Sequence, residues 1–315
     1  MKRTSIISTL LSTGMLTALS VSAAPIQRAD VINDPVWVLH VDADGLRSTV
    51  VGQYILAEMA KPEAQKKLAA LQAISGFDPG KDLHGVTLYG ATKSEEDGIL
   101  LVYADFDAAR LTTLAEGAKE HTSVTHGGYT IHSWIDEKKP EKNGVKPRTY
   151  AAIAGKTVVF GQKESSVADA LDVLARTRPN LLTNAQFARL ADAPAFILGA
   201  ARKPELPGND PNAAILKQSK LVMLSVNEVQ RKLGATLTLE ADTEEIAGQI
   251  ESIGRGLIGL LSLQQDKPEA QKIAQGLAVQ RDGLVVKASL SLPADAAVEI
   301  IKADAARKAA KAEKE

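Results

Sequence analysis

The chain has 315 residues, of which 45% are hydrophobic and 24% are charged, and this balance excludes a disordered or collagen-like protein. The 37 Lys and Arg residues nearly balance 38 Asp and Glu residues, so no basic excess indicates a nucleic-acid partner. The chain has no cysteine, which excludes disulfides, thiol nucleophiles and iron–sulfur or cysteine-ligated zinc sites. Its length fits one large domain or two of average size.

The first 23 residues have the pattern of a secretory signal peptide. Lys2 and Arg3 are basic, residues 6–21 are apolar or small, and residues 21–23 place small side chains before the expected cleavage site. The alternative is an N-terminal membrane anchor, but the apolar stretch is short and contains several Ser and Thr residues. We therefore expect a bacterial periplasmic or secreted protein that is soluble after signal removal and has no later transmembrane segment.

Hydrophobic periodicity predicts a first α+β module over residues 24–178. Its expected strands cover residues 36–42, 85–91, 98–105, 129–135, 149–154 and 157–162. Its expected helices cover residues 46–74, 107–119 and 165–176. Asp44 and Asp105 are expected to cap the first two of these helices, because Asp side chains accept backbone N–H bonds at helix starts.

A structured connector is expected over residues 179–193, with a short helix capped by Thr183 or Asn184. The second module then covers residues 194–305 and precedes a charged helical tail over 306–315. Its expected strands cover residues 195–200, 221–227, 233–241, 277–280 and 284–291, and its expected helices cover 211–218, 243–275 (long or broken) and 294–310. In the 243–275 segment, Gly248, Ser252, Gly256 and Gly259 predict close packing against a neighbour.

Three sequence matches in the same order predict that one module is a copy of the other. Residues 35–39 resemble 194–198, the strand that ends at Asp105 resembles the one that ends at Asp242, and residues from Gly155 match those from Asp282. The repeat of residues 61–66 as 267–272 indicates a different register, and chance similarity is the alternative. The expected fold class is α+β, with two tandemly duplicated modules, each a mostly antiparallel sheet with helices packed on one face.

Three residues are candidate contacts for a ligand or a partner: Trp134, His132 and His126. Trp134 and His132 share one face of an expected strand beside an exposed loop, and His126 precedes that strand. His121 lies nearby, but the histidine spacing fits no helical i, i+4 pair and no HExxH motif, so we expect no metal site. His40 and His84 are expected to be structural or solvent-facing.

No catalytic signature is present in the sequence. It contains no G-x-S-x-G elbow, Walker loop or strand-following G-x-G-x-x-G motif, so we assign no catalytic residue and no cofactor. The sequence favours an exported, non-enzymatic interaction or structural module of the bacterial envelope, with a protein partner. One alternative is a periplasmic ligand-binding protein that uses the cleft between the modules. The other is a hydrolase whose site is assembled from scattered acids and histidines.

Overall fold

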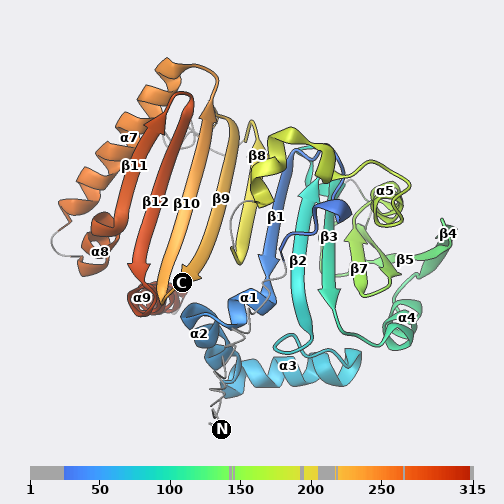
Figure 1. Ribbon diagram of the computed structural model, residues 1–315. Coiled ribbons are helices and arrows are strands. Elements are labelled where there is room, and N and C mark those ends of the chain that lie inside the picture. Colours follow the sequence, from blue (N-terminus) through green and yellow to red (C-terminus); the bar gives the residue numbers. More distant parts are fainter. Residues whose placement is uncertain are drawn as a thin grey trace, which may run out of the picture.

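One antiparallel sheet of twelve strands runs through the molecule (Figure 1). The computed structural model describes residues 25–141, 144, 146–191, 195–204, 217, 219–264 and 267–312. The expected signal peptide and nearly all of the expected helix at 211–218 lie outside these residues, as does the end of the charged tail. The strand order in the sheet is β11-β12-β10-β9-β8-β1-β2-β3-β7-β6-β5-β4.

The strands and helices have the following bounds. The strands are β1 Trp37–Asp42, β2 Leu83–Gly90, β3 Gly98–Ala104, β4 Thr122–His126, β5 Tyr129–Ile135, β6 Arg148–Ala154, β7 Thr157–Gly161, β8 Ile197–Arg202, β9 Ser219–Val229, β10 Lys232–Ala241, β11 Leu277–Asp282 and β12 Val285–Pro293. The α-helices are α1 Ala43–Arg47, α2 Val50–Met59, α3 Pro62–Ser75, α4 Ala108–Glu116, α5 Glu164–Leu174, α7 Glu244–Ser262, α8 Pro268–Gly276 and α9 Ala294–Ala312. The 3-10 helices of the described residues are η1 Arg28–Asp30, η2 Glu95–Asp97, η3 Leu181–Thr183 and η4 Ala185–Ala191.

The helix expected over residues 46–74 is three helices, and this part of the prediction was wrong. Thr49 caps the start of α2, because its side chain accepts a hydrogen bond from the Gly52 N–H at 2.8 Å. Pro62 occupies the first turn of α3, where its missing N–H costs nothing, whereas inside a continuous helix it would break the hydrogen-bond ladder. Pro268 starts α8 in the same way and separates it from α7.

The aspartates that cap α1 and α4 are not the two that were predicted. Asp42, not Asp44, caps α1 by accepting the Gly45 N–H at 2.8 Å. Asp107, not Asp105, caps α4 by accepting the Arg110 N–H at 3.1 Å. The displaced acids are therefore available for other contacts, which are described below. In the connector, Asn184 accepts the Gln186 N–H at 3.0 Å, in agreement with one of the two expected caps.

The sheet carries a hydrophobic core on opposite faces in its two halves. Cross-strand partners share a face, whereas successive residues in a strand point to opposite faces. The first core joins α5, η3 and η4 to one face and includes Val38, Tyr89, Leu101, Val159, Val167, Leu171, Leu181, Phe187 and Leu198. The second core joins α7 to the other face and includes Leu239, Ala241, Ala247, Ile250 and Val286. Each half therefore carries its main core on one face, and in the first half α4 also covers the opposite face of β5, β6 and β7.

The two halves share this single sheet and meet at β1 and β8, which pair in antiparallel register from Trp37 and Ala201 to Val41 and Ile197. From this centre outward the order is β1-β2-β3-β7-β6 on one side and β8-β9-β10-β12-β11 on the other. In each half, the third strand along the sequence therefore pairs with the last one, β3 with β7 and β10 with β12. β5 and β4 extend only the first half, and β4 is a strand that the sequence analysis missed.

Contacts between α2 and the second half add to this strand pairing. The Glu228 carboxylate at the end of β9 accepts hydrogen bonds from the backbone N–H groups of Val50 and Val51, at 2.9 to 3.4 Å. A carboxylate at this position is favourable, because the first N–H groups of a helix have no partner within the helix and its N-terminal end is partly positive. The Lys302 ammonium of α9 also lies 5.6 Å from the centre of the Tyr54 ring.

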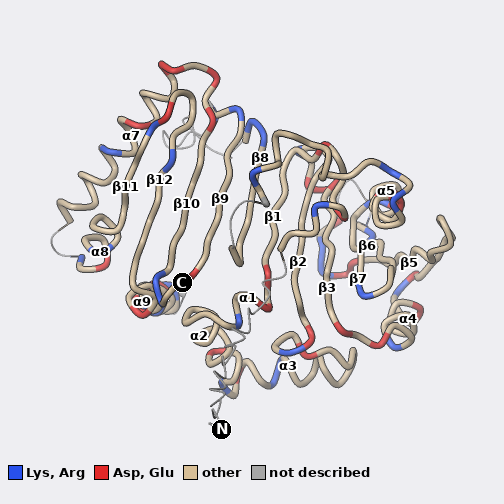
Figure 2. Tube along the Cα trace, in the orientation of Figure 1, with Lys and Arg blue, Asp and Glu red and all other residues tan. Residues whose placement is uncertain are grey.

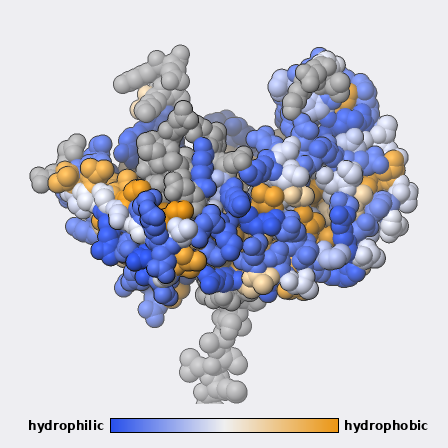
Figure 3. All heavy atoms as spheres, turned by 90° about the horizontal axis from the view of Figure 1, so that it is seen from above, coloured by the Kyte–Doolittle hydropathy of each residue, from blue (hydrophilic) through white to orange (hydrophobic). Residues whose placement is uncertain are grey.

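Charged residues are sparse in the middle of the sheet. Figure 2 shows the Lys, Arg, Asp and Glu positions mostly at strand ends, in turns and on helices. Apolar side chains are exposed along α7 and just after its end, where Ile253, Leu257, Leu260 and the C-cap residue Leu263 have exposed fractions that increase from 39% to 74%. Seen from above, the surface in Figure 3 is mostly hydrophilic, with groups of hydrophobic residues between the hydrophilic ones. Among the described residues, no helix combines the length and hydrophobicity needed to cross a bilayer.

Candidate ligand pocket under helix α4

Helix α4 leaves a cavity of about 290 Å³ between itself and the sheet. The Asp107 cap starts the helix, and its apolar side faces β5, β6 and β7. Leu111, Leu114 and Ala115 form the helical wall, at the i, i+3 and i+4 spacing of one helix face, and Ala118 lines the cavity just after the end of α4. The helix is thus amphipathic, but it covers the sheet without filling the space beneath it.

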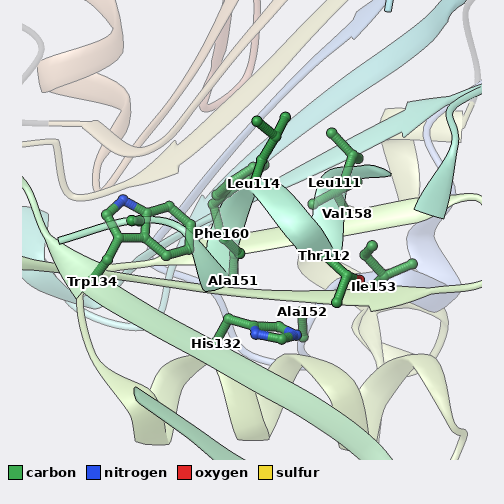
Figure 4. Close-up of a pocket in the computed structure, with 12 residues that line it drawn as sticks. Leu111, Thr112, Leu114, His132, Trp134, Ala151, Ala152, Ile153, Val158 and Phe160 are labelled. Carbon is green, nitrogen blue, oxygen red and sulfur yellow. The ribbon is translucent and has the colours of Figure 1, made fainter. Parts of the chain in front are cut away.

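The floor of the cavity is the sheet face opposite to the first core. His132, Ala151 and Phe160 are cross-strand neighbours on β5, β6 and β7, and all three line the cavity. Trp134 lies two residues after His132 and therefore on the same face (Figure 4). None of the residues that line the cavity, all within the described part of the chain, is charged. Such a lining favours an apolar occupant.

Besides Thr112, the polar feature of this lining is His132, which contacts His121. His121 Nε2 lies 3.0 Å from His132 Nδ1, and the two rings stack with centroids 5.3 Å apart. One ring nitrogen must donate and the other must accept, so at least one imidazole is uncharged. Burial lowers the pKa of His132, and a charge on His121 lowers it further. His132 therefore offers an uncharged imidazole to a ligand.

The apolar floor continues from the cavity across the sheet. From the cavity residue Phe160, successive cross-strand partners are Leu100, Leu88 and Leu39. Beyond Leu39 the same row passes through Gly199, Leu224, Leu237 and Ala288 to Val279, which packs against the second core. Leu39, Leu88, Leu100 and Phe160 are half-buried, and Leu224 is 36% exposed. An apolar track thus leads out of the cavity over the middle of the sheet.

The structure brings two of the three expected contact residues together. Trp134 and His132 both line the cavity, whereas His126 is separated from them by the sheet. His126 belongs to β4, opposite Tyr129, and its Nε2 lies 2.8 Å from Asp172 Oδ1 on α5. Sequence reasoning placed His126 in a loop because β4 was not recognised. It also missed Phe160 and the apolar side of α4, although the helical period of residues 111–118 is visible in the sequence.

The remaining histidines have structural partners. The His40 Nδ1 lies 2.9 Å from Thr87 Oγ1 in the buried part of the sheet. His84 is on β2, where its Nδ1 lies 3.0 Å from Asp44 Oδ2 and its Nε2 lies 3.1 Å from Asp105 Oδ2. These are the two acids that the sequence analysis took for helix caps. Over the described ranges, no three His, Asp or Glu side chains are arranged to hold a metal ion.

Comparison with known proteins finds structural similarity only. No protein-family model matches the chain, and no curated protein is similar to it in sequence. The structure of crystal form III of TP0453 aligns with a TM-score of 0.48 and 14% identity, over 88% of this chain and 97% of that one. Crystal form I of TP0453 aligns with a TM-score of 0.45 and 12% identity, over 88% and 96% of the two chains. Similarity at this level says nothing about ligand or activity.

Proposed function

We propose that this chain is an exported, non-enzymatic binding protein that holds an apolar molecule with an uncharged polar end between α4 and the sheet. The observation that carries the proposal is the uncharged cavity under α4, with Trp134 and His132 in its lining. An uncharged ligand is favoured because His132 resists protonation and the lining offers no opposite charge.

The ligand is proposed to be a single acyl-type chain that carries a hydroxyl or ester group. The cavity is near the lower limit for small-molecule sites, which suits a narrow chain better than a bulky ring system. Phe160, Leu100, Leu88 and Leu39 extend the apolar contact beyond the cavity. Each buried methylene contributes about 0.8 kcal/mol, so a chain that follows this track gains affinity with length.

The proposed ligand site lies within the first half of the chain, whereas the sequence analysis considered a site in the cleft between the modules. The hydrolase alternative loses its support, because His126 and His132 are on opposite faces of the sheet and no carboxylate lines the cavity. Export to the bacterial periplasm or medium, a protein partner in the envelope and a non-enzymatic role remain proposals. Their supports are the residue pattern of the N-terminus and the missing catalytic motifs.

We also infer that the two halves descend from one duplicated unit. Support comes from the order of the three sequence matches and from the equivalent strand orders on the two sides of β1 and β8. The repeat shared by residues 61–66 and 267–272 supports a different alignment, but α3 precedes the second strand of its half, whereas α8 follows the third. The shared hexapeptide instead supplies the same local start signal, Lys-Pro, to two helices in different topological positions.

The test is a titration of 1-dodecanol into the mature chain, followed by tryptophan fluorescence. The chain has two tryptophans, so a Trp37→Phe background leaves Trp134 as the reporter. We expect a saturable change in emission with 1-dodecanol, tighter binding with 1-tetradecanol, and weaker binding with dodecylammonium. An absence of saturable binding by either alcohol would overturn the proposal.

A matched pair of variants on α4 locates the site. Ala115 lines the cavity, and Ala109 is exposed on the same helix without lining it. Ala115→Phe fills the cavity and is expected to weaken 1-dodecanol binding at least tenfold, whereas Ala109→Phe leaves the affinity unchanged. Equal effects of the two substitutions would show that the alcohol binds elsewhere.

A further inference from the structure

Helix α7 covers the end of the sheet that β10, β12 and β11 form, at the opposite end from β4 (Figure 1). Ala247 and Ile250 are buried in the second core, and Gly254 faces Val279 of β11. Gly256 follows Ala247 by about two and a half helical turns, so it lies on the opposite side of the helix, away from the sheet. We call this side, centred on Gly256, the outer face of α7.

The outer face combines large apolar residues with small ones. Its exposed members are Ser252, Ile253, Gly256, Gly259, Leu260 and Leu263. A Cβ at Gly256 or Gly259 would meet nothing within 4 Å, so no other part of the described chain packs there. The outer side of a surface helix is normally polar, and glycine lowers helix stability. An apolar outer face with glycines is therefore typical of a helix that another helix approaches closely.

The two ends of the outer face carry opposite charges. Glu245 is exposed in the first turn of α7, and Lys267 is exposed just beyond its last turn. Neither forms a salt bridge with another described residue, whereas Arg255 lies 2.8 Å from Glu251 of the same helix. A helix that binds an anionic lipid surface has mainly basic polar positions, and the acidic end of α7 does not fit that pattern. Opposite charges at the two ends instead complement a second copy of α7 that runs antiparallel.

We propose that α7 is a dimerisation helix, which packs antiparallel against α7 of a second copy of this chain about a two-fold axis at Gly256. Residues equally far before and after Gly256 then lie level with each other across the interface. Ile253 lies level with Gly259 of the second copy, and Leu260 lies level with its Ser252. The glycine at the crossing lets the two backbones approach. This interface uses only the second half of the chain and does not depend on ligand binding under α4.

Sedimentation equilibrium of the mature chain, from about 1 μM to about 200 μM, tests the proposal. We expect a monomer–dimer equilibrium. Leu260→Glu should weaken the dimer at least about tenfold, because it would bury a charge in the interface. Leu182→Glu is the matched control and should leave dimerisation unchanged, since Leu182 is 55% exposed, against 61% for Leu260, but lies on η3.

Two further variants test the crossing point and the charges. Gly256→Leu adds apolar surface where the single chain has open space, so a non-specific apolar contact would become tighter. Close helix packing at Gly256 should instead become at least about tenfold weaker. Glu245→Lys should weaken the dimer by a smaller factor, about threefold, because the charges are exposed. Adding Lys267→Glu to it should restore the wild-type affinity.

A cross-link locates the two-fold axis. The chain has no cysteine, so Gly256→Cys introduces a single thiol. Two such thiols at the crossing point lie within reach of a disulfide. We expect mild oxidation to give a covalent dimer of Gly256→Cys and to leave Leu182→Cys monomeric.

Several results would refute the dimer. These are a chain that stays monomeric over the whole concentration series, an equal effect of Leu260→Glu and Leu182→Glu, and a tighter association of Gly256→Leu. A monomeric chain that cosediments with phosphatidylcholine–phosphatidylglycerol vesicles, and loses this binding in Leu260→Glu, would assign the outer face to a lipid surface instead. Circular dichroism and thermal unfolding of each variant identify any effect caused by misfolding.

Discussion

Leu221 and Val222 are consecutive residues of β9, yet they belong to the hydrophobic cores on opposite faces of the sheet. Leu221 is part of the core under η4 and α5, and Val222 packs against the core under α7. The change of covered face thus takes place at β9. Each half leaves part of its other face less covered, and the apolar track past Leu39 and Leu224 crosses this region.

The first prediction concerns the independence of these two cores. Leu101 is fully buried in the first core and Leu239 is 4% exposed in the second. Leu101→Ala and Leu239→Ala should each lower the free energy of unfolding by about 2–5 kcal/mol, because each leaves a cavity. Since the residues lie on opposite faces, the double variant should show additive losses within about 0.5 kcal/mol. Urea unfolding measures both effects.

The control for this pair is Leu182→Ala. Leu182 is 55% exposed, and its truncation should change the free energy of unfolding by at most about 0.5 kcal/mol. Strong coupling in the double variant would mean that the two cores unfold through one shared packing arrangement.

The second prediction separates two glycines of α7. A Cβ at Gly248 would meet nothing within 4 Å, whereas a Cβ at Gly254 would lie 3.1 Å from a methyl group of Val279 on β11. Gly248→Ala should raise the free energy of unfolding by about 0.5–1 kcal/mol, because alanine loses less backbone entropy in a helix. Gly254→Ala should gain less than Gly248→Ala or lose stability, since Val279 would have to move. Urea unfolding of both variants that gives the reverse order would contradict this assignment.

These glycines also correct the sequence analysis. Close packing was expected at Gly248, Gly256 and Gly259, but a Cβ at any of these three positions would stand in open space. Among the glycines of α7, Gly254 is the one at which an added methyl group would contact the sheet. Spacing alone predicted that small residues line one face of the helix. The position of β11 determines that Gly254 is the glycine that lies against the sheet.

The third prediction is a pH dependence of stability from His84. Burial acts to lower the pKa of His84, but the hydrogen bonds and charges of Asp105 and Asp44 outweigh it and raise the pKa above 6.5. The folded state therefore holds the proton more tightly than the unfolded state. Its contribution to stability is fully present below pH 6.5 and is lost as the pH rises through the folded-state pKa.

Thermal unfolding of wild type and His84→Gln between about pH 5.5 and 8.5 checks this sign. The Tm advantage of wild type should be largest at the acid end of the range and should decline toward the alkaline end. Asp105→Asn should reduce the same pH dependence, because it removes one of the two carboxylates. A wild-type advantage that increases with pH would refute the proposed cause.

The fourth prediction concerns His132 and has the opposite sign. Burial and the charge of His121 lower its pKa, so the unfolded state binds the proton more tightly. The stability contributed by neutral His132 is present above pH 6.5 and is lost as the pH falls through the folded-state pKa. In His132→Gln, the acid-induced decrease in Tm should be smaller than in wild type. Binding of 1-dodecanol to wild type should weaken over the same interval, because protonation brings a charge into the apolar cavity.

The sequence by itself determined most elements, because their signals are local. Alternation of apolar and polar residues predicted eleven of the twelve strands, although their ends differ by a few residues. The exception is β4, where residues 122–126 are largely exposed and contain one apolar side chain, Val124. This strand lies at the edge of the sheet with side chains that are largely exposed, so it lacks the apolar alternation that marks a half-buried strand.

Tertiary structure decided what these elements do together. Continuity of the sheet depends on the pairing of β1 with β8, whose residues are about 160 positions apart, and neither strand's local pattern specifies its neighbour. The same applies to the sites. Phe160 of β7 and His132 of β5 line one cavity because β6 pairs with both strands, at Ala151. Local sequence sets which face a side chain takes, whereas long-range pairing sets what that face meets.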